Sequence, residues 1–299
     1  MRVFFDNVDL NSNSGPNSFG RRLCVELQQM GHVIAVTPTD PCDAQLSFIR
    51  TTRKEARRIA LRLDGIYFNT RQDWLDMNRP LSRSHEEADV VIYQSNFNKR
   101  LTEKYFGQAR SSVVINNGTC LDTVSKIHPS QHHSLDKFSE VWSCSSMWRP
   151  HKRLRDNVNY FLEQAPQSAG LVVAGSNPDY VIQHPRVVYA GQQTWQDCIA
   201  LYKRSNVFLH LAFLDHCPNV VVDARASGCR LVVASSGGTR EIAGPDASVV
   251  EDMEWDMSPL DLYDPPALTF CNASRNGIES SVDIRRAAAK YAETLELSS

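Results

Sequence analysis

The feature that most constrains the fold is a regular alternation of short β-rich runs with helical stretches. The first series of apolar runs comprises RVFF (2–5), VIAV (33–36), QLSFI (45–49), IALRL (59–63), VVIY (90–93) and VVI (113–115). Stretches of helix-like composition lie between them, at 19–31, 71–87 and 97–106. Such alternation predicts a mainly parallel sheet with helices on both faces.

A polar, aperiodic segment at 123–137 interrupts the alternation, which then restarts. Apolar runs follow at 140–144, 170–175, 186–191, 207–212, 230–235 and 247–250, with helical stretches near 152–164 and 194–204. A chain of 299 residues suits two domains. We therefore predict an α/β protein of two Rossmann-like, doubly wound domains, at 1–130 and 138–280. Residues 282–299 are expected to form a C-terminal helix that could pack back on the N-terminal domain.

Composition excludes several classes of protein. A formal net charge of −2 gives no general attraction to nucleic acid. None of the eight cysteines forms a C-x-x-C pair, which argues against a zinc ribbon and favours reduced thiols in a cytoplasmic protein. No apolar run approaches the ~20 residues of a membrane span. A basic run, Arg50, Arg53, Lys54, Arg57 and Arg58, is either a solvated face or a peripheral contact with a membrane or an anionic acceptor.

The stretch LDHCPNVVVDARASG (214–228) brackets three valines with two aspartates. It reads either as a strand that turns into a hairpin or as a helix with Pro218 in its first turn and Gly228 as its cap. The helix is favoured because parallel strands need a crossover between them. Asp215 then precedes the helix, and the free N–H groups at the helix start, around 218–220, favour an anion such as phosphate. Alternatively, Asp215 only caps the helix and Asp223 is solvated.

A second stretch, SSMWRPHKRL (145–154), places Arg149, Lys152 and Arg153 where a helix is expected to begin. Three cations at a helix N-terminus oppose its dipole, so they indicate an anion there unless they form a plain solvated turn. A third stretch, SSGGTREI (235–242), has a Gly-Gly turn, with Glu241 beginning a helix. The glycines either admit a ligand close to the backbone or only make the turn.

Together these stretches resemble the C-terminal half of family 4 glycosyltransferases (glycosyl transferases group 1). The family signature, E-x7-E around PNV, reads here Asp215-x7-Asp223. The first half agrees in order, with NSGPNSFG, LRLDGIYFN, VVIYQSNFNK and VVINNG, so the resemblance covers about residues 1–250. It implies the GT-B fold, in which two Rossmann-like domains face across a cleft.

The resemblance also implies a site. Asp215 would lie at the donor sugar near the anomeric centre and Asp223 at the donor ribose, while Lys152, helped by Arg149, would neutralise the diphosphate. The remaining donor-binding residues it implies are Pro218, Asn219, Val220, Gly15 and Gly191. The family works without a metal or other cofactor, and no D-x-D metal motif occurs in this sequence.

Three departures from the family pattern stand out. Both glutamates are shortened to aspartate, and Ser146 and Met147 occupy the usual place of the arginine, so Arg149 is assigned as its substitute. The N-terminal histidine of many members is not evident. Asp64, after the run 59–63, stands at about that point in the order and is assigned to face the sugar, with a simple turn residue as the alternative.

The sequence therefore predicts an enzyme: a glycosyltransferase that moves a sugar from a nucleotide sugar to a hydroxyl of a glycan or other acceptor. By the resemblance it would be retaining and metal-independent. The alternatives are an epimerase or phosphorylase on the same fold, and a non-catalytic protein that binds sugar nucleotides.

Overall fold

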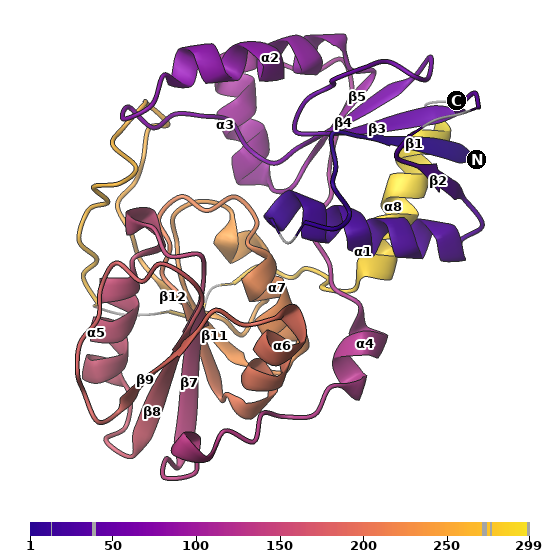
Figure 1. Cartoon of the computed structure of the whole chain (residues 1–299). Coiled ribbons are helices and arrows are strands. Elements are labelled where there is room, and N and C mark those ends of the chain that lie inside the picture. Colours follow the sequence, from indigo (N-terminus) through magenta and orange to yellow (C-terminus); the bar gives the residue numbers. More distant parts are fainter. Residues whose placement is uncertain (13, 38–39, 271–273, 276, 298–299) are drawn as a thin grey trace. The chain divides into compact units, whose positions relative to one another are not determined.

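The computed structural model describes residues 1–12, 14–37, 40–270, 274–275 and 277–297. It divides the chain into two compact units (Figure 1). Unit 1 comprises Met1–Cys120 and Asp283–Ser299, and unit 2 comprises Leu121–Val282. The C-terminal segment thus belongs to the same unit as the N-terminus.

Unit 1 is built on a six-stranded sheet in the order β2-β1-β3-β4-β5-β6, whose strand pairings are parallel. Its strands are β1 (Arg2–Asp6), β2 (Val33–Ala35), β3 (Ala44–Phe48), β4 (Ile59–Leu63), β5 (Val90–Tyr93) and β6 (Ser112–Val114). Its helices are α1 (Gly15–Gln29), α2 (Trp74–Glu87), α3 (Asn96–Phe106) and α8 (Ile284–Leu297).

Helix boundaries in unit 1 follow local chemistry. α1 has proline in its first turn, where a missing N–H costs no hydrogen bond. Ser95 caps α3 by accepting from the Asn98 N–H at 3.1 Å, and Gly107 ends that helix at a φ of 80°. α8 packs on α1 and on the sheet, and Phe19 and Tyr291 meet in the shared core.

Unit 2 is built on a seven-stranded sheet in the order β13-β12-β11-β10-β7-β8-β9. Its strands are β7 (Glu140–Ser145), β8 (Ala169–Ala174), β9 (Val187–Gly191), β10 (Val207–His210), β11 (Arg230–Ala234), β12 (Ser248–Val250) and the antiparallel β13 (Ser274–Arg275). Its α-helices are α4 (Leu121–Lys126), α5 (Leu154–Gln164), α6 (Trp195–Arg204) and α7 (Asn219–Ala226), and short 3-10 turns are η1 (His133–Leu135), η2 (Pro150–Lys152) and η3 (Thr239–Glu241).

The helix reading of the valine-rich stretch is confirmed. α7 begins directly after Pro218, ends before Gly228 at a φ of 91°, and connects β10 to the parallel strand β11. Val221 and Val222 are fully buried on its inner face. The valine run therefore forms part of the hydrophobic core, whereas the aspartates on either side of it have polar partners, which are described below.

The structure corrects one local expectation, that for Glu241, and adds detail to two others. The polar segment 123–137, which interrupts the alternation of strands and helices, contains the end of α4 and all of η1. Glu241 does not begin a helix but ends η3. Seven of the eight cysteines lie in the described residues and form no disulfide bond there, whereas Cys271 lies outside those residues.

Candidate functional site

The strand order of unit 2 points to one place in its sheet. β7 and β10 are neighbours, but the chain leaves β7 toward β8 on one side and leaves β10 toward β11 on the other. Ligands of open parallel sheets bind at such a switch point, beyond the carboxyl ends of the strands. The segments that follow these two strands contain Lys152 and Asp215, respectively.

Lys152 and Asp215, 63 residues apart in sequence, form an ion pair at this point. The Lys152 Nζ donates to Asp215 Oδ2 at 2.5 Å. The two side chains are 18% and 15% exposed, so the pair is partly shielded from water and still reachable from it. Partial shielding strengthens an ion pair relative to a fully solvated one.

A third side chain, His210 at the end of β10, completes this cluster. Its Nε2 lies 3.0 Å from the same Asp215 Oδ2, and the residue is 4% exposed. Burial alone would raise the pKa of Asp215, but Lys152 and His210 hold it well below its ordinary value. Asp215 is therefore a carboxylate at neutral pH. Burial lowers the pKa of His210, with the hydrogen bond to Asp215 opposing that shift in part.

The backbone of Asp215 is held as firmly as its side chain. The Gly238 N–H donates to the Asp215 carbonyl at 2.7 Å. At Gly237, with a φ of 80°, an added Cβ would lie 2.5 Å from that carbonyl oxygen. The missing side chains of the Gly-Gly turn therefore let the Asp215 loop lie directly against the backbone of that turn. The sequence alone did not suggest this structural role for the two glycines.

Two further histidines lie beside the ion pair and are uncharged at neutral pH. Burial, together with Lys152, lowers the pKa of His151 to about 3. Burial also lowers the pKa of His216 to about 4. His151 stacks on Tyr263, with ring centroids 6.0 Å apart and planes at 20°. The site thus combines one fixed ion pair with imidazoles that add no charge.

The predicted anion-binding residues Pro218, Asn219 and Val220 form the start of α7. Pro218 is the N-cap and makes no side-chain capping bond, and the first turn of the helix has no acidic residue. An eight-residue helix with an uncapped N-terminus has a positive end that favours an anion. Pro218 lies three residues after Asp215 in the chain, so the ion-pair partner of Lys152 and the start of α7 belong to the same loop.

The structure contradicts one of the two sequence interpretations of Asp223, namely that it is a solvated side chain. It is 3% exposed and not solvated, and the Trp195 indole N–H donates to its Oδ2 at 3.0 Å. Trp195 is the first residue of α6. Nothing in the sequence indicated this contact, because a single tryptophan at the start of a helix is normally interpreted as a residue that packs in the core.

The two arginines of the basic turn 149–153 have different surroundings. Arg149 is exposed, and its guanidinium lies near enough to His151 to lower the pKa of that imidazole. Arg153 instead points inward and donates to Asp252 at 2.7 and 3.2 Å. The prediction that Arg153 belongs to an anion-binding cluster is therefore wrong. Its partner Asp252 follows β12 and was missed, since nothing in the sequence links positions 99 residues apart.

Gly191 ends β9 at a φ of 68°, and an added Cβ there would meet open space. Its carbonyl accepts the Gly175 N–H at 2.7 Å. Gly175 itself lies tightly against the segment after β7, because an added Cβ would come 1.8 Å from the Ser146 carbonyl oxygen. Gly175 is thus a second glycine of the carboxyl edge, one that the sequence analysis did not single out.

The two remaining predicted residues, Asp64 and Gly15, belong to unit 1. Asp64 follows β4 and accepts hydrogen bonds at Oδ1 from Arg62 and Gln94. Arg62 also donates to Asn117 Oδ1 at 3.0 Å, so the carboxyl ends of neighbouring strands share one polar network. Burial raises the pKa of Asp64, although Arg62 opposes the rise. Gly15 is not in a loop but is the first residue of α1.

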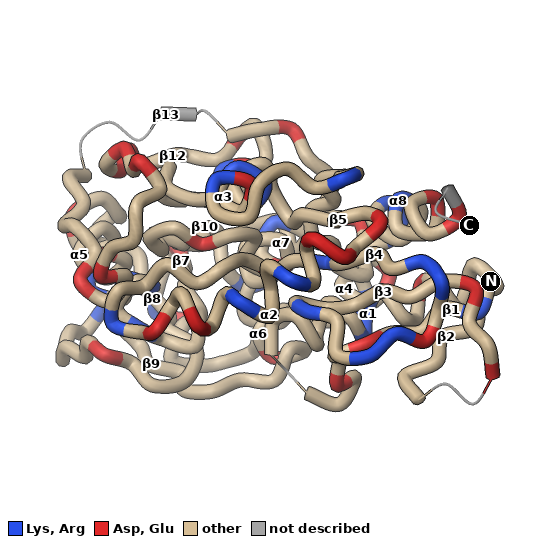
Figure 2. The backbone as a smooth tube through the Cα atoms, turned by 90° about the horizontal axis from the view of Figure 1, so that it is seen from above, with Lys and Arg blue, Asp and Glu red and all other residues tan. Residues whose placement is uncertain are grey.

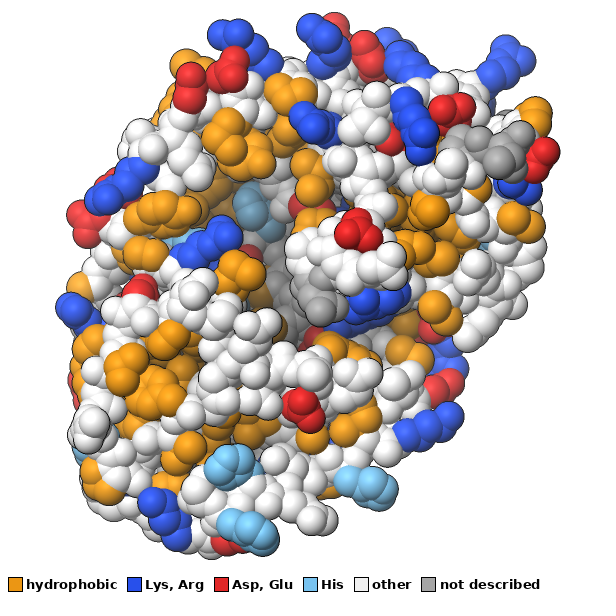
Figure 3. All heavy atoms as spheres, in the orientation of Figure 1, with side chains coloured by type: hydrophobic (Ala, Val, Ile, Leu, Met, Phe, Trp, Pro, Cys, Tyr) orange, Lys and Arg blue, Asp and Glu red, His pale blue; other side chains and the backbone are white. Residues whose placement is uncertain are grey.

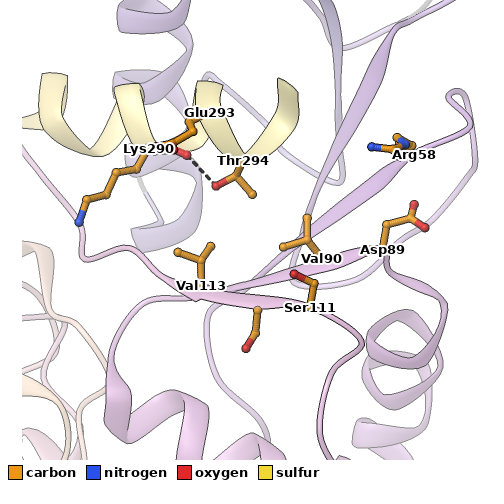
Figure 4. A pocket seen from close by; sticks show the side chains of 9 residues that line it. Arg58, Asp89, Val90, Ser111, Val113, Lys290, Glu293 and Thr294 are labelled. Atoms are coloured by element: carbon orange, nitrogen blue, oxygen red, sulfur yellow. Dashed lines mark hydrogen bonds between the residues drawn. The ribbon is translucent and has the colours of Figure 1, made fainter. Parts of the chain in front are cut away.

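A separate hollow in unit 1 lies at the amino ends of β4, β5 and β6, beside α8 (Figure 4). Its lining includes two cations and two carboxylates, namely Arg58, Lys290, Asp89 and Glu293. The Asp89 carboxylate already accepts the Ile59 N–H at 2.8 Å. Because this is the edge opposite to the one where parallel sheets bind ligands, we assign the hollow no role in the site.

Lys and Arg as well as Asp and Glu occur along the backbone of both units (Figure 2). In the space-filling view, blue and red side chains alternate along the upper rim, over α2 (Figure 3). Lys54 of the basic run pairs with Glu87 at 3.1 Å. Within the described part of the chain, no helix combines the length and apolar character needed to cross a membrane. In the same residues, no group of three or more His, Cys, Asp or Glu side chains is arranged so that it could hold a metal ion.

Comparison with known proteins assigns this architecture. Residues 141–257 match the family Glycosyl transferases group 1. No match was found among curated proteins. HepE of Anabaena, solved in complex with UDP-glucose, is 15% identical with a TM-score of 0.66, and the match covers 99% of this chain and 100% of HepE.

Two other solved structures are similar over nearly their whole length. The sucrose-phosphate synthase of Thermosynechococcus elongatus is 14% identical, with a TM-score of 0.64 and coverage of 99% of this chain and 94% of that one. WaaG, a glycosyltransferase of lipopolysaccharide biosynthesis, is 10% identical, with a TM-score of 0.63 and coverage of 100% and 93%. These likenesses show the GT-B fold, and within it residues 141–257 are similar to the family Glycosyl transferases group 1.

Proposed function

We propose that this chain is a glycosyltransferase that takes its sugar from a nucleoside diphosphate sugar bound at the carboxyl edge of unit 2. The observation that carries the proposal is the Lys152–Asp215 ion pair, which lies at the switch point between β7 and β10. The uncapped start of α7 follows in the same loop. A cation beside a helix N-terminus suits a diphosphate, and the adjacent carboxylate suits the hydroxyls of a sugar.

In the proposed reaction, the bond from the sugar to the diphosphate breaks and negative charge grows on the departing phosphate oxygen. Lys152, with exposed Arg149, would offset that charge, and the N–H groups at Asn219 and Val220 would add to the effect. Groups placed where charge develops lower the barrier more than groups that bind the substrate equally at all stages. We propose that these cations act without a metal and that the reaction retains the anomeric configuration, as the family 4 resemblance implies.

Asp223 is proposed to bind the donor ribose and Asp64 to face the transferred sugar. Because Asp223 is almost wholly buried against Trp195, its contact with a ribose requires the side chains at α6 and α7 to shift when the donor binds. The acceptor is proposed to be a hydroxyl of a glycan or a similar molecule. HepE was solved with UDP-glucose, so UDP sugars are the first donors to test.

A thermal-shift panel with UDP, GDP, ADP and their sugars tests the proposal. One nucleoside diphosphate should raise the melting temperature, because a ligand that binds only the folded state stabilises it. Lys152→Ala should abolish that rise and lower kcat/KM about 100-fold or more. Asp223→Ala should also abolish transfer, with both variants still folded. If both variants keep full activity, the site is assigned wrongly.

Incubation with donor and no acceptor separates the rival functions. A transferase gives at most slow hydrolysis, whereas an epimerase converts the sugar. A phosphorylase would instead require inorganic phosphate. Binding of a nucleotide with no turnover across a broad acceptor panel would identify a non-catalytic protein. Transfer that continues undiminished in EDTA, with the product anomer assigned by NMR, would support the metal-independent, retaining form of the proposal.

A further inference from the structure

A single carboxylate oxygen in the site has two donors from different elements. Asp215 Oδ2 accepts from Lys152 of η2 and lies 3.0 Å from Nε2 of His210, the last residue of β10. An ionised carboxylate can only accept hydrogen bonds, and Asp215 is ionised because these two neighbours hold its pKa low. The His210 Nε2 must therefore carry the proton in this contact.

The two donors differ in their freedom to move. Lys152 is 18% exposed and has a long flexible chain at the end of a short turn. His210 is buried within a strand, where its ring stacks on Phe208 with the planes at 11°. The phosphate oxygens of a ligand can attract the Lys152 ammonium away from Asp215, but they cannot move the buried His210 imidazole. A carboxylate this buried would be costly to leave without any donor.

We infer that His210 is a positioning residue for Asp215. Its Nε2–H holds the carboxylate in place, and this leaves Lys152 able to turn to a diphosphate without loss of the carboxylate's orientation. The part of this inference that concerns catalysis, namely that Lys152 turns to a diphosphate, rests on the proposed function. The charged or titratable groups that face His210 and Asp215 are Lys152 and the neutral His151 and His216.

The first test needs no ligand. In the full-length protein, long-range ¹H–¹⁵N NMR should show the His210 ring as the neutral Nε2–H tautomer, both in the wild type and in Lys152→Met. Because either donor can satisfy the carboxylate, Lys152→Met and His210→Leu should each lower the melting temperature modestly. The double variant should lower it by at least about 2 °C more than the sum of the two. An Nδ1–H tautomer or additive shifts would overturn the inference.

The second test measures catalysis by donor hydrolysis with UDP-glucose, GDP-mannose and ADP-glucose. His210→Leu should keep the Kd for the matching diphosphate within about twofold and lower kcat about tenfold or more. His210→Gln, whose amide N–H can occupy the Nε2 position, should restore most of the lost kcat. A His210→Leu variant with unchanged kcat would overturn the inference. Absence of binding and hydrolysis in the wild type would instead refute the proposed function, while the tautomer and stability results would stand.

Discussion

At the scale of single residues, the site is built around a carboxylate that is one methylene shorter than the glutamate of the E-x7-E signature. Asp215 reaches Lys152 at 2.5 Å and His210 at 3.0 Å from the same oxygen. The surrounding loop is fixed by Gly237 and Gly238, so the carboxylate cannot easily be displaced. Aspartate is therefore the residue that fits this arrangement.

A longer acid should fit less well. Asp215→Glu adds a methylene in a partly buried space and should lose one of the two hydrogen bonds at the carboxylate. We expect kcat to fall about tenfold or more, with a lower melting temperature, because these donors orient the carboxylate that is proposed to contact the donor sugar. Donor hydrolysis and a thermal scan measure both effects, with Asp215→Asn as the matched variant of unchanged length. Activity equal to the wild type in Asp215→Glu would show that the short acid is incidental.

The histidines around the ion pair should make stability depend on pH. Because burial lowers the folded-state pKa of His216 to about 4 and that of His151 to about 3, the unfolded chain binds protons first as pH falls. Their contribution to stability is complete above pH ~6.5. Below it, each loses about 1.4 kcal/mol per pH unit until the pH reaches its folded-state pKa, about 4 for His216 and about 3 for His151. The lowered pKa of Asp215 adds its own loss only below pH ~3.8.

Urea unfolding at pH 7, 6 and 5 checks this dependence. The free energy of unfolding should fall toward pH 5, and His216→Asn should make that fall shallower. A wild-type stability that stays flat or rises between pH 7 and pH 5 would mean that these imidazoles are not buried in their neutral form.

At the scale of elements, the turn after β11 matters because it holds the Asp215 loop. Gly237→Ala would place a Cβ 2.5 Å from the Asp215 carbonyl, at a φ of 80°. We expect a loss of more than about 2 kcal/mol in stability together with most of the activity. Gly191→Ala is the matched control, since it also has a positive φ but opens into free space. It should cost only about 1–2 kcal/mol. Equal effects in the two variants would contradict this account of the turn.

The elements also show what could be predicted from the sequence and what could not. Strands such as β8 were predictable because buried parallel strands read as continuous apolar runs. α7 was predictable because parallel strands require a crossover. The partners of the site residues were not predictable, because His210 lies inside the apolar run VFLHLA and reads as core. Arg153 looked like a free cation because its partner, Asp252, is distant in sequence.

At the scale of the whole molecule, the C-terminal helix is part of the first unit. Ile284, Ala288, Tyr291 and Leu295 of α8 are almost fully buried in the core of unit 1. Leu295→Ala should lower the stability of that unit by about 2–5 kcal/mol, because it leaves a cavity in the core. The exposed Lys290→Ala on the same helix should change it by less than about 0.5 kcal/mol. Chemical denaturation measures both, and equal losses would mean that α8 does not belong to that core.

The most direct test of the central claim is an experimental structure with the nucleoside diphosphate that stabilises the protein most. The account predicts that the diphosphate lies at the start of α7, with its terminal phosphate within ion-pair distance of Lys152 Nζ and with Asp215 still bonded to His210. A diphosphate bound away from the carboxyl ends of β7 and β10, with the Lys152–Asp215 pair undisturbed, would contradict it.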